Sequence, residues 1–251
     1  MKAVQEHQSE PKRRLITYDD RVVAFMDILG FQSLVPHDNE GADRLATALL
    51  AAQGIFAPLR AAGETKRNAG RTVTHFSDSI VLSFKENEKS GVYYNLLLIL
   101  HLHIRLIELD ILVRGGIAIG KVVHNGNLLF GPAMNDAYLL EKNAALYPRI
   151  IVTPDIFSLA RKHHADHLNS ADEEMAVHDI VKKDADGMFY IDYFDGAASE
   201  VEHNTFYGYK LREIIRLGLN SNRVDLQVKY MWMREKFNDS IWVIRFKLPP
   251  L

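Results

Sequence analysis

The segment VVAFMDILGF, Val22–Phe31, constrains the fold of this chain more than any other segment. Its run of apolar residues predicts a β-strand over Val22–Asp27 that is buried in a hydrophobic core. Asp27 ends this strand, where a buried carboxylate without a partner costs several kcal/mol or takes up a proton. Asp27 therefore needs a partner, which is a cation of the protein, a metal ion or water.

The rest of the sequence alternates apolar segments of strand length with segments of helical periodicity. Further strands are predicted at Thr72–Phe76, Ile80–Phe84, Arg149–Thr153, Met188–Phe194 and Ile241–Phe246. A strand followed by a hairpin with its turn at Asn125-Gly126 is predicted within residues 111–131. A loop is predicted at Pro36–Gly41, and helices at Asp43–Leu59, Gly91–Glu108, Asn135–Asn143, Pro154–Arg161, Thr205–Leu217 and Arg223–Phe237. The embedded hairpins favour an α/β (α+β) fold, with a mixed, mainly antiparallel sheet, helices packed on it and further helices near the C-terminus.

Composition narrows the class of protein. Of the 251 residues, 47% are apolar and 25% are charged, which is typical of a globular protein. The formal net charge of -2 gives no reason to expect a nucleic-acid partner. The absence of cysteine excludes disulfides, thiolate metal sites and a cysteine nucleophile. No apolar run is long enough to cross a membrane, and the polar N-terminus lacks the apolar core of a signal peptide, so we expect a cytoplasmic protein without a membrane partner.

Asp78, like Asp27, is a carboxylate at the end of an apolar strand. It stands in a tight turn between the predicted strands Thr72–Phe76 and Ile80–Phe84. If these strands are neighbours of Val22–Asp27, the two carboxylates converge on one edge of the sheet and repel each other. A divalent metal ion, which prefers oxygen ligands, would neutralise both. The alternative is that Asp27 caps a turn and Asp78 bonds its own backbone. Each residue alone favours that alternative, whereas the pair favours a metal site.

Four segments carry a resemblance to a known family. FMDILGF, HFSDSIVLSF, VRGGIAIGKVV and FGPAMNDAYLLE follow one another in the order and approximate spacing of motifs in class III nucleotidyl cyclases. The resemblance covers roughly Val22–Phe157 and is greatest to the divergent bacterial uridylate and cytidylate cyclases of the Pycsar antiphage system. It implies a class III cyclase-type, ferredoxin-like fold that works as a homodimer with active sites at the interface.

The resemblance also implies a division of the chain and a reaction. Residues 1–19 would be a flexible arm, 20–165 the cyclase catalytic core, and 166–251 an extension that packs on the core and supports the dimer or the active site. The enzyme would be a lyase that converts a nucleoside triphosphate to a 3',5'-cyclic nucleotide and pyrophosphate with two Mn²⁺ or Mg²⁺ ions per site. The product would be a second messenger sensed by a separate effector protein.

Family motifs assign roles to individual residues. Asp27, Asp78 and the backbone carbonyl of Ile28 match the metal ligands, and Asn135 matches the asparagine that orients the ribose. Gly30 allows close approach of the backbone to a ligand. Backbone N–H groups beside a metal-binding carboxylate suit a triphosphate. The nucleotide-binding residues expected on these grounds and from the base-recognition positions are Leu29, Gly30, Phe31, Thr74 and Leu128.

This chain differs from the family pattern at residues that recognise the base of the nucleotide. Thr74 stands where adenylate cyclases have a lysine, and Leu128 stands where they have an aspartate. A site without these groups loses much of its discrimination for adenine, so we expect a pyrimidine substrate. Thr74 could hydrogen-bond the smaller base, with His75 as the alternative. UTP is favoured over CTP because uridylate cyclases are the commoner type among the relatives, and no residue decides between the two.

Leu139 stands where the family has its transition-state arginine, and a leucine cannot neutralise phosphate charge. Lys142, two helical turns after Asn135, is a candidate replacement or a solvated surface lysine. Arg114 serves the triphosphate or pairs with a structural carboxylate, and the structural role is slightly preferred. Arg71 and Lys229 are further candidates without a decisive argument.

The differences from the family motifs leave two other functions open. The first is a nucleotide-binding or dimerisation module whose chemistry has lapsed, although retention of both aspartates and Asn135 argues against it. The second is a purine cyclase with rebuilt base recognition.

Overall fold

The computed structural model describes residues 16–31, 35, 38–54, 70–200 and 205–251. Most of the arm expected at residues 1–19, and parts of the predicted loop Pro36–Gly41 and helix Asp43–Leu59, lie outside the described residues. Among the described residues, no helix combines the length and apolarity required to cross a membrane.

An eight-stranded sheet organises the described part of the chain. Along the sheet the order is β2-β3-β1-β4-β6-β8-β7, and β5 pairs with β4 off this path. Of these neighbours, β4 and β6 pair in parallel and the others are antiparallel. The strands are β1 (Asp19–Ile28), β2 (Thr72–Phe76), β3 (Ser79–Lys85), β4 (Val113–Asn125), β5 (Leu128–Phe130), β6 (Ile150–Val152), β7 (Val181–Lys183) and β8 (Phe189–Ile191).

The first part of the sheet has ferredoxin-like topology. Its elements follow the chain as β1, α2 (Asn39–Gly54), β2, β3, α4 (Gly91–Glu108) and β4, while the spatial order is β2-β3-β1-β4. The predicted fold class, a mixed and mainly antiparallel sheet with helices and further C-terminal helices, is confirmed.

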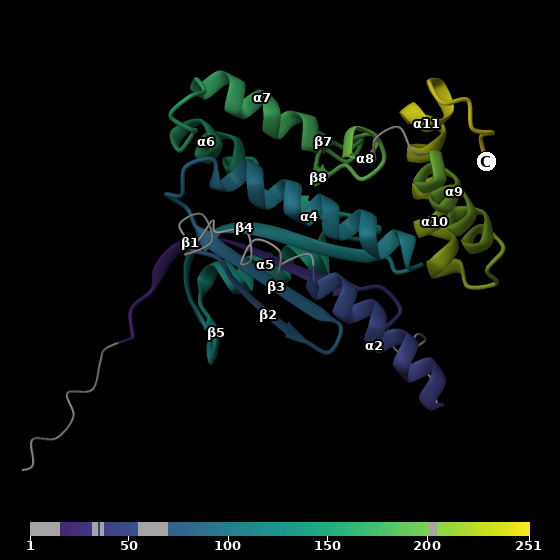
Figure 1. Cartoon of the computed structure of the whole chain (residues 1–251), viewed down its shortest axis with the longest axis horizontal. Helices are drawn as coiled ribbons and strands as arrows, with labels where there is room; N and C mark the ends of the chain where they lie inside the picture. Colours follow the sequence, from purple (N-terminus) through teal and green to yellow (C-terminus); the bar gives the residue numbers. More distant parts are fainter. Residues whose placement is uncertain (1–15, 32–34, 36–37, 55–69, 201–204) are drawn as a thin grey trace, which may run out of the picture.

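Helices cover both faces of this sheet (Figure 1). Because side chains alternate along a strand, β1 sends Val22, Ala24 and Met26 to the face under α4, and Val23 and Phe25 to the face under α5 (Pro132–Asn143). Asp27 continues the second set and so lies on the α5 face.

The remaining helices extend the α4 side and one end of the molecule (Figure 1). Those that pack beyond α4 are α6 (Asp155–Lys162), α7 (Ser170–Ile180) and α8 (Gly196–Glu200). Those gathered near the C-terminus are α9 (Thr205–Leu219), α10 (Val224–Asn238) and α11 (Ile241–Ile244).

A buried cation joins α10 to the sheet. Arg149, which is fully buried just before β6, forms ion pairs with Asp184 and Asp186. Trp232 of α10 donates its indole N–H to Asp184 at 2.8 Å and stacks on Tyr147 with ring centroids 5.2 Å apart. The sheet itself runs across residue 165, since β8 pairs with β6. A functional division at that residue stays a proposal.

The predicted strand Ile241–Phe246 is wrong, because residues 241–244 form α11. Trp242 is fully buried, donates its indole N–H to the Phe194 carbonyl at 2.9 Å and stacks on Phe246 at 5.1 Å. These contacts bury the apolar run as a helical turn, and the periodicity of so short a run does not distinguish a strand from a helix.

The hairpin and the last strand also differ from prediction. Asn125 pairs with Leu128, so the turn residues are Gly126 and Asn127, and the Asn125 side chain accepts from the N–H groups of residues 127 and 128. Strand β8 ends at Ile191, short of the predicted Phe194, because the next side chain, Asp192, accepts from the Phe194 N–H and turns the chain. The elements α7, β7 and α8 were not predicted.

The close packing of α5 on β4 depends on Gly116. A Cβ at this residue would lie 2.4 Å from the Ala137 carbonyl oxygen and 2.5 Å from the Leu140 Cβ. We expect Gly116→Ala to lower the free energy of unfolding by about 1–3 kcal/mol through overpacking, measured by urea denaturation. Gly126→Ala is the control, because a Cβ added there would meet no described residue within 4 Å beyond its chain neighbours, and we expect a change within about 0.5 kcal/mol. Equal effects would show that α5 does not depend on this contact.

His103 makes stability depend on pH. Its ring is fully buried against Tyr193 at 4.1 Å, and neither ring nitrogen has a hydrogen-bond partner among the described residues. Burial lowers the pKa of His103 to about 3, so the folded protein holds the neutral ring. Stability from this group is present above the unfolded pKa of about 6.5 and is lost as pH falls toward 3.

We therefore expect His103→Leu to gain stability relative to the wild type on acidification. Between pH 6.5 and pH 5 the gain should be about 1.6 kcal/mol, since the slope rises from about half of 1.4 kcal/mol per pH unit at the unfolded pKa to nearly the full value at pH 5. Urea denaturation of both proteins at several pH values measures it. A constant difference across this window would contradict the buried neutral ring.

Candidate active site

The two predicted carboxylates meet at one edge of the sheet. Asp27 pairs with Ser79 at the start of β3, directly after Asp78 in the β2–β3 turn. The Ile28 N–H donates to the Asp78 carbonyl at 3.0 Å and so joins this turn to the end of β1. Burial is the main cause that raises the pKa of Asp27, and repulsion from Asp78 adds to it, while Arg114 and a hydrogen bond to Ser79 oppose the shift.

Arg114 lies between Asp27 and a third carboxylate. The β1–β4 register places Arg114 opposite Asp27, and a guanidinium nitrogen lies 3.8 Å from the Asp27 carboxylate. The Arg114 Nε lies 2.6 Å from Oε1 of Glu141, whose side chain is 4% exposed. Burial raises the pKa of Glu141, and the guanidinium of Arg114 opposes this rise. Arg114 thus partly neutralises both acids, and its role in a reaction stays a prediction.

Glu141 was not predicted. The signal for it is the spacing of Ala133, Ala137 and Glu141, which places a carboxylate at the end of the buried stripe of α5. Contact between this stripe and the glycine-rich part of β4 brings Glu141 to Arg114.

The segment after β1 turns sharply. Gly30 has a φ of 69°, a left-handed conformation that glycine adopts without steric cost. The N–H of Leu29 donates to the Leu112 carbonyl at 2.8 Å and is therefore engaged within the sheet. The Phe31 carbonyl accepts from the Val35 N–H at 3.0 Å.

Thr74 and His75 lie on opposite faces of β2. Thr74 shares the α5 face with Asp27, and its hydroxyl lies 2.9 Å from Nε2 of His124. His75 faces the α4 side, where burial lowers its pKa. Arg71 also faces α4, since its Nε donates to Asn95 of that helix at 2.7 Å. Only Thr74 of these three residues lies on the face of the carboxylates.

The residues predicted on α5 and β5 point outward. Asn135, Leu139 and Lys142 are exposed on α5, and Lys142 lies over the ring of Tyr138 at 5.6 Å. Leu128 of β5 is 40% exposed. Within the described residues, no hydrogen bond or ion pair connects Asn135 or Lys142 to the carboxylates of the same chain. Lys229 lies on α10, in the helical group near the C-terminus.

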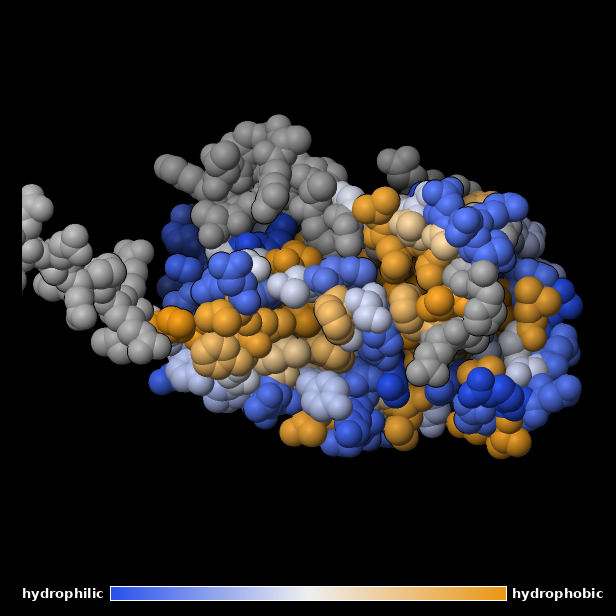
Figure 2. All heavy atoms as spheres, turned by 90° about the horizontal axis from the view of Figure 1, so that it is seen from below, coloured by the Kyte–Doolittle hydropathy of each residue, from blue (hydrophilic) through white to orange (hydrophobic). Residues whose placement is uncertain are grey.

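Exposed hydrophobic side chains gather around these outward residues. Figure 2 shows them as a band across the left half of the face seen from below, in the part of the molecule where β5 and β2 lie. The large exposed hydrophobic residues of β2, β5 and α5 are Phe76, Leu128, Phe130, Tyr138 and Leu139. Phe76, which precedes the β2–β3 turn, is 79% exposed. A surface of this kind is typical of an interaction site.

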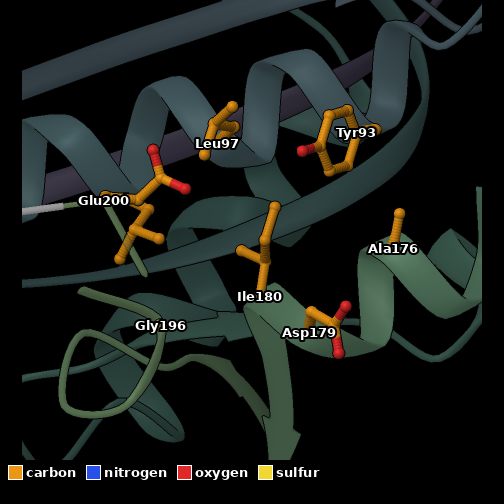
Figure 3. A pocket seen from close by; sticks show the side chains of 8 residues that line it. Tyr93, Leu97, Ala176, Asp179, Ile180, Gly196 and Glu200 are labelled. Carbon is orange, nitrogen blue, oxygen red and sulfur yellow. The ribbon is translucent and has the colours of Figure 1, made fainter. Parts of the chain in front are cut away.

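Two cavities lie beside helices of the described part of the chain. One of about 440 Å³ lies beside α5 and is lined in part by Asp136, Leu139 and Asn143. The other, of about 140 Å³, is lined by Tyr93, Asp179 and Glu200 between α4, α7 and α8 (Figure 3). Because it lies on the far side of α4, the second cavity is separate from the carboxylates.

The donor set fits hard divalent cations. Asp27 and Asp78 supply carboxylate oxygens, and the chain at Ile28 passes between them. Mg²⁺ and Mn²⁺ prefer such ligands and commonly complete their coordination with water and substrate phosphates. No group of three or more histidine or acidic side chains in the described ranges could hold a metal ion, so the phosphates of a substrate would have to supply the further oxygens.

Comparisons with known proteins find similar structures only. No protein-family profile and no curated protein matches the chain. The adenylyl cyclase CyaB from P. aeruginosa aligns with a TM-score of 0.49 and 16% identity, over 70% of this chain and 94% of that chain. A bacterial light-regulated adenylyl cyclase aligns with a TM-score of 0.40 and 18% identity, over 55% of this chain and 78% of that chain.

A class III adenylyl cyclase-like ATP-binding protein from Pseudomonas aeruginosa aligns with a TM-score of 0.39 and 15% identity, over 82% of this chain and 44% of that chain. All three likenesses are low, so the fold assignment rests on the strand order described above and the functional argument on the site itself.

The charge balance of the site predicts how Asp27→Asn behaves. The raised pKa of Asp27 means that its ionised form is a net cost to folding at neutral pH, and this cost falls as the pH drops through the folded pKa and is absent below the unfolded pKa. We expect Asp27→Asn to unfold at a higher temperature than the wild type without metal at pH 7.5. We also expect the variant to lose the stabilisation that millimolar Mn²⁺ or Mg²⁺ gives the wild type with nucleotide, because bound ions stabilise the folded state.

Thermal unfolding with and without metal and nucleotide measures both effects. Asp19→Asn, at the other end of β1, is the control and should retain the metal response. A metal response retained by Asp27→Asn would contradict the metal site.

Proposed function

We propose that this protein is a metal-dependent nucleotidyl cyclase that converts UTP to 3',5'-cyclic UMP and pyrophosphate as a homodimer. The observation that carries the proposal is the meeting of Asp27 and Asp78 at one edge of a ferredoxin-like sheet. Two converging carboxylates, of which Asp27 alone lies beside an arginine, need a further cation, and a triphosphate brings one. By the resemblance of its motifs, the product is a second messenger of antiphage defence that a separate effector senses.

Residues at this edge have defined parts in the reaction. Asp27, Asp78 and the Ile28 carbonyl would hold Mn²⁺ or Mg²⁺, which when bound neutralises the triphosphate and lowers the pKa of the ribose 3'-hydroxyl. That hydroxyl would give up its proton to water and attack the α-phosphorus, the bond to the β-phosphate oxygen would break, and pyrophosphate would leave. Arg114, paired with Glu141 at 2.6 Å, adds positive charge beside the Asp27 carboxylate at 3.8 Å.

The outward residues of α5 belong to a site shared between two copies. Asn135 and Lys142 are exposed on a single chain, so in the proposal they serve the carboxylates of the second copy. The exposed side chains of Phe76 on β2, Leu128 and Phe130 on β5 and Tyr138 on α5 support such an interface. Asn135 would orient the ribose, and Lys142 would supply the cation that Leu139 does not.

One observation favours a second candidate function. Leu139 is 48% exposed and apolar where the related family has an arginine, which suits a nucleotide-binding or dimerisation module without catalysis. Two further substrates, CTP and a purine nucleotide, stay as alternatives to UTP.

The test incubates purified protein separately with ATP, GTP, CTP and UTP, with Mn²⁺ or Mg²⁺, and identifies products by mass spectrometry. We expect cyclic UMP as the main product and at least about a 100-fold loss in Asp78→Asn, since even changes to groups that only support metal ligands cost 10–100-fold. Asp225→Asn, on exposed α10 surface, should keep full activity.

Each alternative has its own outcome. Cyclic CMP as the main product would replace only the base assignment, and a purine product at least equal to cyclic UMP would indicate rebuilt purine recognition. Nucleotide binding without turnover in the wild type would favour the module without catalysis.

A further inference from the structure

A chain of four polar side chains crosses the α5 face of the sheet. Arg21 of β1 donates from Nε to the hydroxyl of Ser83 on β3 at 2.8 Å. That hydroxyl lies 2.8 Å from Nδ1 of His124 on β4, whose Nε2 lies 2.9 Å from the hydroxyl of Thr74 on β2. Arg21, Ser83 and His124 are at most 7% exposed, whereas Thr74 is half-buried at the end of the chain. We call these four residues the polar relay.

The direction of hydrogen bonding in the polar relay follows from its first member. A guanidinium group has no acceptor, so Arg21 can only donate to Ser83. The one acceptor that the described residues offer to the Ser83 hydroxyl proton is Nδ1 of His124. Because buried polar groups are paired, Ser83 donates to Nδ1, and the proton of the neutral imidazole lies on Nε2.

The outcome at Thr74 is a hydroxyl proton that points away from the relay. His124 Nε2–H donates to the Thr74 oxygen, so Thr74 keeps its own proton for another acceptor. Burial and the neighbouring Arg21 lower the pKa of His124 to about 4, which keeps the ring neutral at physiological pH. The opposite tautomer would leave the Ser83 proton buried without an acceptor, an arrangement that folded proteins avoid.

Thr74 lies at the right place to meet the far edge of a base. It is two strands away from Asp27 and two residues farther from the carboxylate edge, which corresponds to about 12 Å by strand geometry. In a pyrimidine nucleotide the substituent at position 4 is opposite the glycosidic nitrogen and therefore extends farthest from the phosphates. This substituent is a carbonyl acceptor in uracil and an amino donor in cytosine.

We propose that the polar relay makes Thr74 a hydrogen-bond donor to O4 of uracil and thereby selects UTP over CTP. Thr74 contacts the base, and His124, Ser83 and Arg21 are positioning residues that fix the direction of its hydroxyl. The inference rests on the proposed cyclase function for its substrate, but the tautomer of His124 does not depend on it.

The first measurement is nuclear magnetic resonance of protein with ¹⁵N-labelled histidine. The chain has 11 histidines, so His124→Gln identifies the signals of His124 by their loss. We expect a neutral ring protonated on Nε2 in the wild type, and a shift of the proton toward Nδ1 in Ser83→Ala. A ring protonated on Nδ1 in the wild type would overturn the inference whatever the enzyme does.

The second measurement is the ratio of kcat/KM for UTP to that for CTP. We expect the wild-type ratio to fall about tenfold in Thr74→Val, in line with the loss of one neutral hydrogen bond. Ser83→Ala should lower the ratio in the same direction, and Ser83→Thr, which restores a hydroxyl, should recover it. Thr72→Val is the control, since it removes a hydroxyl that lies on the same strand face and accepts from Nη2 of Arg21 at 3.2 Å, while the contacts from Arg21 Nε through Ser83 and His124 to Thr74 keep all their groups.

The outcomes separate this inference from the proposed function. Turnover of pyrimidine nucleotides with an unchanged ratio in Thr74→Val and Ser83→Ala overturns the relay and leaves the cyclase proposal standing. A wild-type preference for CTP also overturns the relay alone. Absence of both binding and turnover of every nucleotide overturns the two together. A lower ratio in both variants, with recovery in Ser83→Thr, supports the relay.

Discussion

The pairing of β1 between β3 and β4 is the constraint on which the site depends. This strand brings Asp27 into register with Ser79 on one side and Arg114 on the other. The hydrogen bond from the Ile28 N–H to Asp78 then joins the β2–β3 turn to the same edge. A one-residue slip in either pairing would send Asp27 to the opposite face of the sheet, under α4. Register therefore decides whether the carboxylates meet at all.

The site is poorly balanced in charge, and this imbalance is informative. Asp27 and Glu141 share one guanidinium, that of Arg114, while Asp78 repels both, and burial raises the pKa of both Asp27 and Glu141. A fold selected for stability alone would gain by replacing such a cluster with apolar side chains. Retained charge of this kind is typical of a site that acquires its missing cation with a ligand.

The same face holds a second polar group for a different purpose. The polar relay is almost fully satisfied within itself and ends in one half-buried hydroxyl, that of Thr74. Thr74 lies two residues along the strands from the carboxylate edge, so the face has a charged end and a neutral hydrogen-bonding part. That division suits a ligand with a charged group at one end and a polar ring at the other. Elsewhere in the molecule, Arg149 forms ion pairs with Asp184 and Asp186, and Asp184 in turn binds Trp232 and Lys236 of α10.

The sequence by itself determined the strands that carry Asp27 and Asp78, the bounds of α4 and the mixed antiparallel sheet. Periodicity and turn residues are local signals, so these elements can be recognised without neighbours. Only the tertiary structure decided that residues 241–244 are helical, that Glu141 reaches Arg114 and that His124 reaches Thr74. Each of these depends on contacts between segments far apart in the chain. Burial of Trp242, the approach of α5 at Gly116 and the register of four strands leave no mark in the local pattern.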